Sequence, residues 1–134
     1  MIYVIGEHLG TGSRHLTSRR LARLCGVSEE TLLESVVWLN LFDTPGTNSR
    51  LTVDMVERAA ESSDAILLLG RRVARAWALD DLPPLGVVTR NAGQGPLIAL
   101  IPHPSGLNRW WNDPDHEETC EHLLGTLWIR YGRT

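Results

Sequence analysis

Residues 65–79 read AILLLGRRVARAWAL, and this stretch decides the fold class. The run before Gly70 is apolar at every position, which is typical of a strand that is covered on both faces. Gly70 ends the run, and residues 71–79 predict a helix. A fully apolar strand that passes directly into a helix is typical of a mostly parallel sheet with helices on both faces.

Strands and helices alternate along the rest of the chain. Short apolar or β-branched runs predict further strands at residues 2–5, 36–42, 86–88 and 96–101. Spacing and capping residues predict helices at 18–25, from Ser28, from the cap residue Thr52, and from the cap residue Asp113 to about Tyr131. In the helix after Thr52, the residues predicted to share one face are Met55, Val56, Ala59, Ala60 and Ser63. This alternation predicts one domain over residues 1–134, a three-layer α/β/α sandwich around a short, mostly parallel sheet of four to five strands.

Composition and charge limit the kind of partner. The chain of 134 residues has a net charge of −3, which argues against a protein that coats nucleic acid by bulk electrostatics. All 13 basic residues are arginines, and two groups of them, at 14–23 and 71–75, allow a local basic face. Cys25 and Cys120 are isolated and are predicted to be reduced. Without a signal peptide or an apolar run of roughly 20 residues, a cytoplasmic protein is expected.

Three polar loops follow predicted strands, at residues 6–17, 40–50 and 102–113. In open parallel sheets, ligands bind beyond the carboxyl ends of the strands. Because each of these loops leaves such an end, we expect the three loops to build one shared site.

The residues of these loops resemble the uracil-DNA glycosylase superfamily, over nearly the whole chain. Residues 6–10 read GEHLG, similar to the Gly-Glu-Ala-Pro-Gly loop of the iron–sulfur enzymes and the Gly-x-Asn-Pro-Gly loop of the mismatch-specific ones. Asn40 ends a strand before TPGTN at 44–48, which is similar to the family's Asn-(x)-Pro-Pro-Gly-Asn-Arg stretch. Residues 103–109 read HPSGLNR and look like a blend of the His-Pro-Ser-Pro-Leu and Asn-Pro-Ser-Gly-Leu loops of two branches. The cluster cysteines of the iron–sulfur branch are absent, so no cluster is expected.

The resemblance implies roles for His103, Asn40 and Ser105. His103 would donate a hydrogen bond to O2 of the leaving uracil, and one preorganised donor of this kind is worth roughly 10²–10³ in rate. Asn40 would read N3–H and O4, because its amide both accepts and donates. Ser105 would bind a phosphate. From the residues alone, the alternatives are a structural histidine, a polar residue that ends a strand, and a serine that stabilises a turn.

The third loop also has residues suited to DNA. The predicted DNA contacts are Ser105, Gly106, Leu107, Asn108, Arg109 and Trp110. An apolar side chain at a loop tip, such as Leu107, can fill the space that a flipped base leaves. Arginine and tryptophan side chains at 109–111 can line a groove or stack on bases. The alternative for the two tryptophans is packing against the last helix.

The residue that handles the attacking water is predicted to lie in the first loop. A carboxylate can orient water and stabilise a cationic sugar, which favours Glu7, then His8 and more distantly Asp43. The alternative for Glu7 is a carboxylate that faces solvent. By resemblance, His8 stands where other members have Asp or Asn. His15 stands nearest to the phenylalanine on which the family stacks the base, and histidine stacks less well.

These residues favour a monofunctional DNA glycosylase that flips and excises uracil or a related damaged or modified pyrimidine. The expected partners are DNA and the released free pyrimidine, and the protein is expected to act as a monomer in a bacterial or phage-infected cell. No metal or redox cofactor is expected, since His116 and Cys120 on one helix face make only half a metal site. The alternative is a catalytically inactive DNA- or nucleobase-binding protein on the same fold. An enzyme of free nucleosides is disfavoured, because a small ligand needs no wedge such as Leu107.

Overall fold

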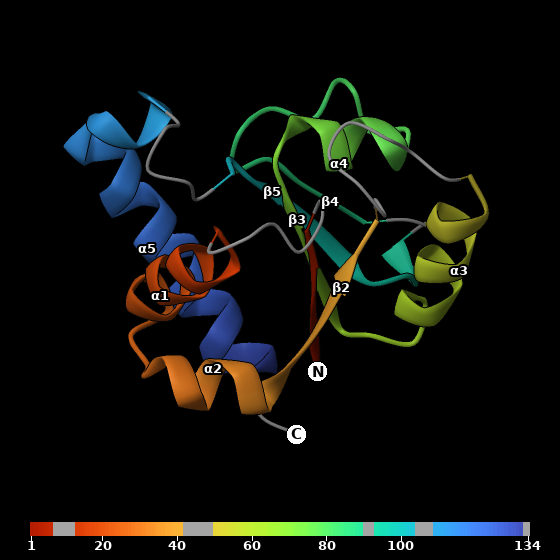
Figure 1. Cartoon of the computed structure of the whole chain (residues 1–134). Helices are drawn as coiled ribbons and strands as arrows, with labels where there is room; N and C mark the ends of the chain where they lie inside the picture. The colour runs from red at the N-terminus through yellow and green to blue at the C-terminus, as the bar shows by residue number, and fades with distance from the viewer. Residues whose placement is uncertain (7–12, 42–49, 90–92, 104–108, 133–134) are drawn as a thin grey trace.

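The computed structural model confirms the α/β class. It describes residues 1–6, 13–41, 50–89, 93–103 and 109–132, with the backbone alone at 13–16 and 50–52. In these residues one five-stranded sheet has the strand order β2-β1-β3-β5-β4, with helices around it (Figure 1). The strands are β1 (Ile2–Gly6), β2 (Val36–Asn40), β3 (Ala65–Leu69), β4 (Val87–Thr89) and β5 (Leu97–Ile101).

The sheet is mostly parallel, as predicted. β1 pairs in parallel with β2 and β3, β3 pairs in parallel with β5, and β4 runs antiparallel to β5 at one edge. The helices in the described residues are α1 (Ser13–Cys25), α2 (Glu29–Ser35), α3 (Arg50–Ala60), α4 (Arg71–Ala76), the 3₁₀ helix η2 (Arg109–Asn112) and α5 (Pro114–Tyr131).

The sheet separates two apolar clusters. β3 is buried at all of its positions, and its side chains alternate between the clusters, as predicted for a strand covered on both faces. On one face Leu67 packs in the cluster that includes residues of α1, α2 and α5. On the other face Leu68 packs in the cluster that includes residues of α3 and α4. The three-layer arrangement therefore follows from apolar side chains on both faces of the central strands.

Two of the predicted caps are confirmed. The Ser28 side chain accepts a hydrogen bond from the Thr31 N–H at the start of α2. The Asp113 side chain accepts one from the Asp115 N–H, and Pro114 occupies the first turn of α5, where its missing N–H costs nothing. In the described ranges, no helix has both the length and the apolar character that a membrane span requires.

Two helix predictions were wrong in position. α1 begins at Ser13, within the segment predicted to be a loop, and α3 begins at Arg50, so Thr52 lies inside the helix rather than at its cap. The buried face of α3 consists of Val53, Val56 and Ala60, whereas Met55 is 62% exposed and Ala59 is exposed. The valine at position 53 starts a stripe at i, i+3 and i+7, and this stripe, rather than the one through Met55, meets the sheet.

Candidate functional site

Four parallel strands end at the same edge of the sheet, which lies uppermost in Figure 1. β1 ends at Gly6, β2 at Asn40, and β3 and β5 lead into Gly70 and His103. The predicted loops therefore leave the strands at one shared edge, where ligands of such sheets bind.

Asn40 lies at the end of β2 and is paired in register with Gly6 of β1. By strand alternation its side chain shares a face with Val36 and Trp38, which pack against the cluster that includes residues of α1, α2 and α5. A Cβ atom on Gly6 would stand 3.0 Å from Asn40 Oδ1 and 3.2 Å from Trp38 Nε1. Glycine at position 6 thus leaves room for both polar atoms over the end of β1.

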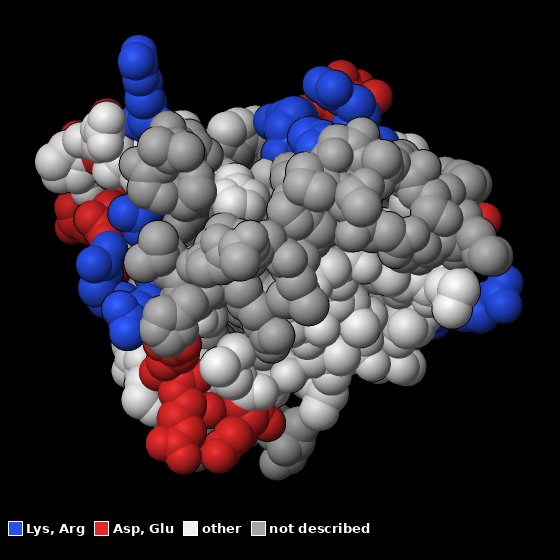
Figure 2. Space-filling view, viewed as in Figure 1, with Lys and Arg blue, Asp and Glu red and all other residues white. Residues whose placement is uncertain are grey.

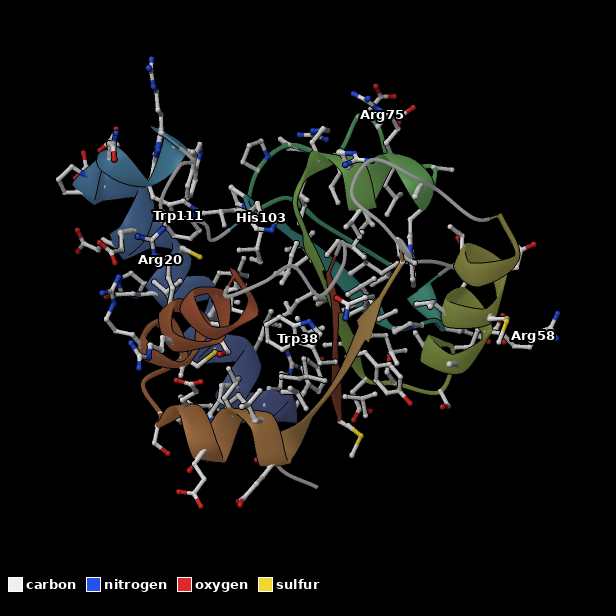
Figure 3. All side chains as sticks on the ribbon, in the orientation of Figure 1. Arg20, Trp38, Arg58, Arg75, His103 and Trp111 are labelled. Carbon is white, nitrogen blue, oxygen red and sulfur yellow. The ribbon has the colours of Figure 1, made fainter. Side chains whose placement is uncertain are left out.

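Trp38 is a candidate that sequence reasoning missed. It projects from β2 toward α1, and it is partly buried (Figure 3). Its spacing of two residues from Asn40 in a strand was the available signal, because residues at i and i+2 face the same side. Neither the Trp38 indole nor the Asn40 amide has a hydrogen-bond partner among the residues that the structure describes.

His103 follows β5 and lines a cavity of about 280 Å³. This volume lies near the lower end of the range of ligand pockets, roughly 300–1,000 Å³. The other residues that line the cavity are Gly70, Arg71, Arg72, Pro84, Leu100, Pro102 and Trp110. Arg71 donates hydrogen bonds from Nη1 to the carbonyl oxygens of Asp80 (3.0 Å) and Leu82 (2.6 Å), so it also holds the segment that follows α4. The cavity therefore combines an imidazole and an indole with two cationic side chains.

Asn40 and His103 lie at the same edge but not in the same cavity, since Asn40 does not line the cavity that contains His103. β1 and β3 lie between their strands. Three strand spacings of roughly 4.8 Å separate the backbones of β2 and β5 by about 14 Å. A ligand that touches both side chains must lie across the ends of β1 and β3.

The two tryptophans of η2 pack against α5. Trp111 is 7% exposed and contacts Trp110 edge to face, with ring centroids 4.8 Å apart. Trp110 stacks on His116 of α5 at 4.4 Å, and His116 Nδ1 lies 2.8 Å from the Trp110 carbonyl oxygen. The packing alternative is therefore correct for Trp111, and Trp110 both packs on α5 and lines the cavity. Arg109 is exposed.

Trp111 also connects two parts of the site. Its indole N–H donates a 3.0 Å hydrogen bond to the His103 carbonyl oxygen, and the Arg20 guanidinium of α1 lies 5.2 Å from a Trp111 ring centroid (Figure 3). The backbone at His103 is thus tied to a buried side chain, which restricts where the imidazole can lie.

Several predicted site residues lie outside the described residues: Glu7, His8, Asp43, Ser105, Gly106, Leu107 and Asn108. For His15 the structure describes only the backbone, which lies in the first turns of α1.

The cysteines offer no nucleophile at neutral pH. Burial raises the pKa of the Cys25 thiol to about 12. Burial, with smaller contributions from Cys25, Glu117 and Glu121, raises the pKa of the Cys120 thiol to about 12. Both cysteines are free, in agreement with the prediction of reduced thiols. No group of three possible metal ligands occurs in the part of the chain that was described.

Arginine side chains gather at the upper margin of the view, over α4. Figure 2 shows them there with carboxylates beside them, and it shows a further group of carboxylates at the lower end, over α2. α4 carries Arg71, Arg72 and Arg75, beside the carboxyl ends of the strands. The edge therefore offers cationic side chains to an anionic ligand, together with the exposed carboxylates of Asp80 and Asp81 that follow α4.

No protein-family model matches the chain, and no curated protein shows significant similarity to it.

Proposed function

We propose that the protein is a monofunctional DNA glycosylase that flips and excises uracil or a related modified pyrimidine from DNA. The observation that carries the proposal is the Asn40 amide, which lies over Gly6 at the carboxyl end of β2 with no hydrogen-bond partner among the described residues. A carboxamide offers an acceptor and two donors on one plane, which suits the edge of a pyrimidine.

The reaction breaks the bond between N1 of the base and C1′ of deoxyribose, and the base departs with the bonding electrons. Water adds to C1′, and the proton that it loses ends on the departing base, so the products are an abasic site and a free base. In this proposal Asn40 binds the base edge, and His103 donates a hydrogen bond to the oxygen on which negative charge develops. Glu7 is the residue proposed to orient the attacking water, and His8 is the second choice. Both assignments come from the sequence alone.

About 14 Å separates the backbones of the strands that carry Asn40 and His103. In this proposal one base lies between the two side chains. Such a base would lie over the ends of β1 and β3, close to Gly6 and Gly70.

Arginines beside this edge support DNA as the substrate. Arg71 and Arg72 line the cavity that contains His103, and Arg109 lies on η2 at the end of the third loop. Phosphate contacts position a nucleic acid without reading its sequence. With DNA as its partner, the protein would act in the cytoplasm of a bacterial or phage-infected cell.

The test is incubation with single-stranded and mismatched oligonucleotides that contain one uracil, followed by alkaline cleavage. Cleaved product from the wild type is expected. His103→Ala should lower the rate by about 10²- to 10³-fold, and Asn40→Ala should lower it by at least about tenfold. Asn112→Ala and His122→Ala are matched controls, because both residues are exposed on η2 and α5. Equal rates for all four variants would refute the assignment of the site.

The alternative is a DNA- or nucleobase-binding protein that does not turn over. One specific feature favours this alternative. His8 stands where the resembled enzymes have Asp or Asn, and His15 stands nearest to their Phe. Salt-sensitive binding to the uracil oligonucleotide, without product, would support this alternative over the glycosylase.

A further inference from the structure

We propose that the cavity beside His103 binds a nucleotide through a terminal phosphate group, with Arg71 holding the phosphate and Trp110 lying against the base. The inference goes beyond the proposed function, because it concerns a second ligand position and does not require excision. It rests on the cavity of about 280 Å³ that Arg71, Arg72, His103 and Trp110 help to line.

Arg71 is held in a way that leaves part of its guanidinium for a ligand. Nη1 donates to the carbonyl oxygens of Asp80 (3.0 Å) and Leu82 (2.6 Å), which occupies both of its N–H groups. The N–H groups on Nε and Nη2 have no partner among the residues that the structure describes. Nε and Nη2 form one edge of the guanidinium, whose parallel N–H groups match two oxygens of a phosphate. Because Arg71 is partly buried and already anchored at Nη1, this edge loses little freedom when it binds.

The segment that Arg71 supports is also held by β5. The Leu85 N–H donates to the Leu100 carbonyl oxygen (2.8 Å), and the Leu100 N–H donates to the Gly86 carbonyl oxygen (3.1 Å). Leu85 has a φ of 60°, a left-handed conformation that is costly for leucine and persists where the surrounding structure imposes it. Pro84, the residue before it, lines the cavity. This wall of the cavity is therefore in place before a ligand binds.

An indole of fixed position also lines the cavity. Trp110 stacks on His116 with ring centroids 4.4 Å apart, and it meets Trp111 edge to face. Together with Pro84 and Pro102 it gives the cavity apolar surface beside the cationic side chains. Inorganic phosphate would leave this surface uncovered, whereas the base of a nucleotide can lie against it.

Size and charge favour a terminal phosphate over one within a strand. The volume is near the lower end of the range for ligand pockets, which suits about one nucleotide. A terminal phosphate carries about 1.5 to 2 negative charges at pH 7, more than a phosphate within the backbone. Two arginines line the cavity, and the exposed carboxylates of Asp80 and Asp81 do not. The ligand class is thus a nucleotide with a phosphate monoester, free or at the end of a DNA strand.

The test measures the binding of 2′-deoxyuridine 5′-monophosphate by calorimetry, with inorganic phosphate and deoxyuridine as partial ligands. We expect the nucleotide to bind at least about tenfold more tightly than either, since charge-assisted bonds and base stacking are each worth about that factor. Arg71→Lys keeps the charge but loses the paired N–H groups, so it should weaken binding by about tenfold or more. Arg75→Lys is the matched control on α4, because Arg75 is exposed and does not line the cavity, and it should change the affinity by less than about twofold.

A measurement on the wild type decides the question even if Arg71→Lys is unstable. In ¹H–¹⁵N NMR spectra the nucleotide should shift the Trp110 indole signal, assigned from Trp110→Phe, and the Gly70 amide signal. The Trp128 indole on α5 does not line the cavity and should not shift. Absence of any shift at millimolar nucleotide, or equal affinities of Arg71→Lys and Arg75→Lys for it, would overturn the proposal.

Competition with a single-stranded oligonucleotide that lacks uracil distinguishes the two sources of the phosphate. Displacement of the nucleotide only by the 5′-phosphorylated form would identify a strand end as the ligand, and displacement by neither form would identify a free nucleotide. Equal displacement by the forms with and without the 5′-phosphate would place backbone phosphates in the cavity and refute the inference. Excision is scored separately, so nucleotide binding without cleavage of a uracil oligonucleotide would refute the glycosylase and leave this site standing, and cleavage without nucleotide binding would do the reverse.

Discussion

Replacing Gly6 with alanine tests the proposed pocket most directly. The new methyl group would stand 3.0 Å from Asn40 Oδ1 and 3.2 Å from Trp38 Nε1, whereas ordinary contacts to a Cβ are 3.4–4 Å. Each side chain must therefore move by a few tenths of an ångström. The backbone adds no strain, because Gly6 is not among the glycines with positive φ.

The expected cost in stability is small. Crowding of this size opposes a gain of about 0.4–1 kcal/mol that alanine brings by restricting the unfolded chain, so the free energy of unfolding should change by less than about 1 kcal/mol. For a chain of 134 residues the entropy of unfolding is about 0.28 kcal/mol/K, so the melting temperature should shift by less than about 4 °C.

The expected cost in function is large. The methyl group would displace the Asn40 amide, which binds the edge of the base in the proposed function. A misplacement of the order of 1 Å in a reacting complex can cost about 10²-fold, and we expect a loss of about that size in the rate of uracil excision.

The assay pairs a thermal melt with single-turnover excision from a uracil oligonucleotide. Gly125→Ala is the control, because a Cβ on Gly125 of α5 would meet no atom within 4 Å. This control should excise at the wild-type rate. A Gly6→Ala variant with the melting temperature and rate of the wild type would show that the base does not bind over Gly6, and a melting temperature lowered by more than about 10 °C would refute the estimate of the crowding.

Three further predictions follow from other parts of the site. Trp111→Phe removes the 3.0 Å hydrogen bond to the His103 carbonyl and part of a buried ring, so it should lower the free energy of unfolding by at least about 1 kcal/mol in urea melts and should lower the excision rate. Leu107→Ala should reduce excision from paired DNA more than from single-stranded DNA, and equal losses in parallel assays would argue against a wedge. The pKa values of Cys25 and Cys120 are raised to about 12 in the fold, so their contribution to stability is complete below the usual thiol pKa and is lost as the pH rises from about 9 toward 12. Urea melts across this range should show the decline, and a thiol reagent at pH 8 should react slowly until the protein unfolds.

Part of the candidate site could be predicted because strand ends are local signals. Asn40 closes a β-branched and aromatic run, and His103 follows an apolar run, so each could be placed at a strand end from sequence alone. The parallel pairing of these strands then puts both residues at one edge. Their separation by two intervening strands depends on the strand order, which no local pattern specifies.

Other features of the site depend on register and packing. Trp38 and Asn40 lie over Gly6 because β1 and β2 pair Gly6 with Asn40, and a shift of one residue would turn the side chains to the other face. Tertiary contacts also explain why the predicted starts of α1 and α3 were wrong. The start of a helix and the stripe that it buries are selected by the contacts available to it, and Val53 rather than Met55 meets the sheet.

The amino-acid sequence by itself determined the α/β class, the central strand before Gly70, the caps at Ser28 and Asp113, and the polar residues at the strand ends. These features depend on the period of apolar residues and on backbone hydrogen bonds within a few residues, so they can be read locally. Only the tertiary structure decided that Trp111 is buried against α5 and tied to His103, and that an indole N–H and a carboxamide oxygen lie together over a glycine. Such arrangements join residues from different strands and helices, and their energy depends on close packing between parts of the chain that are distant in sequence.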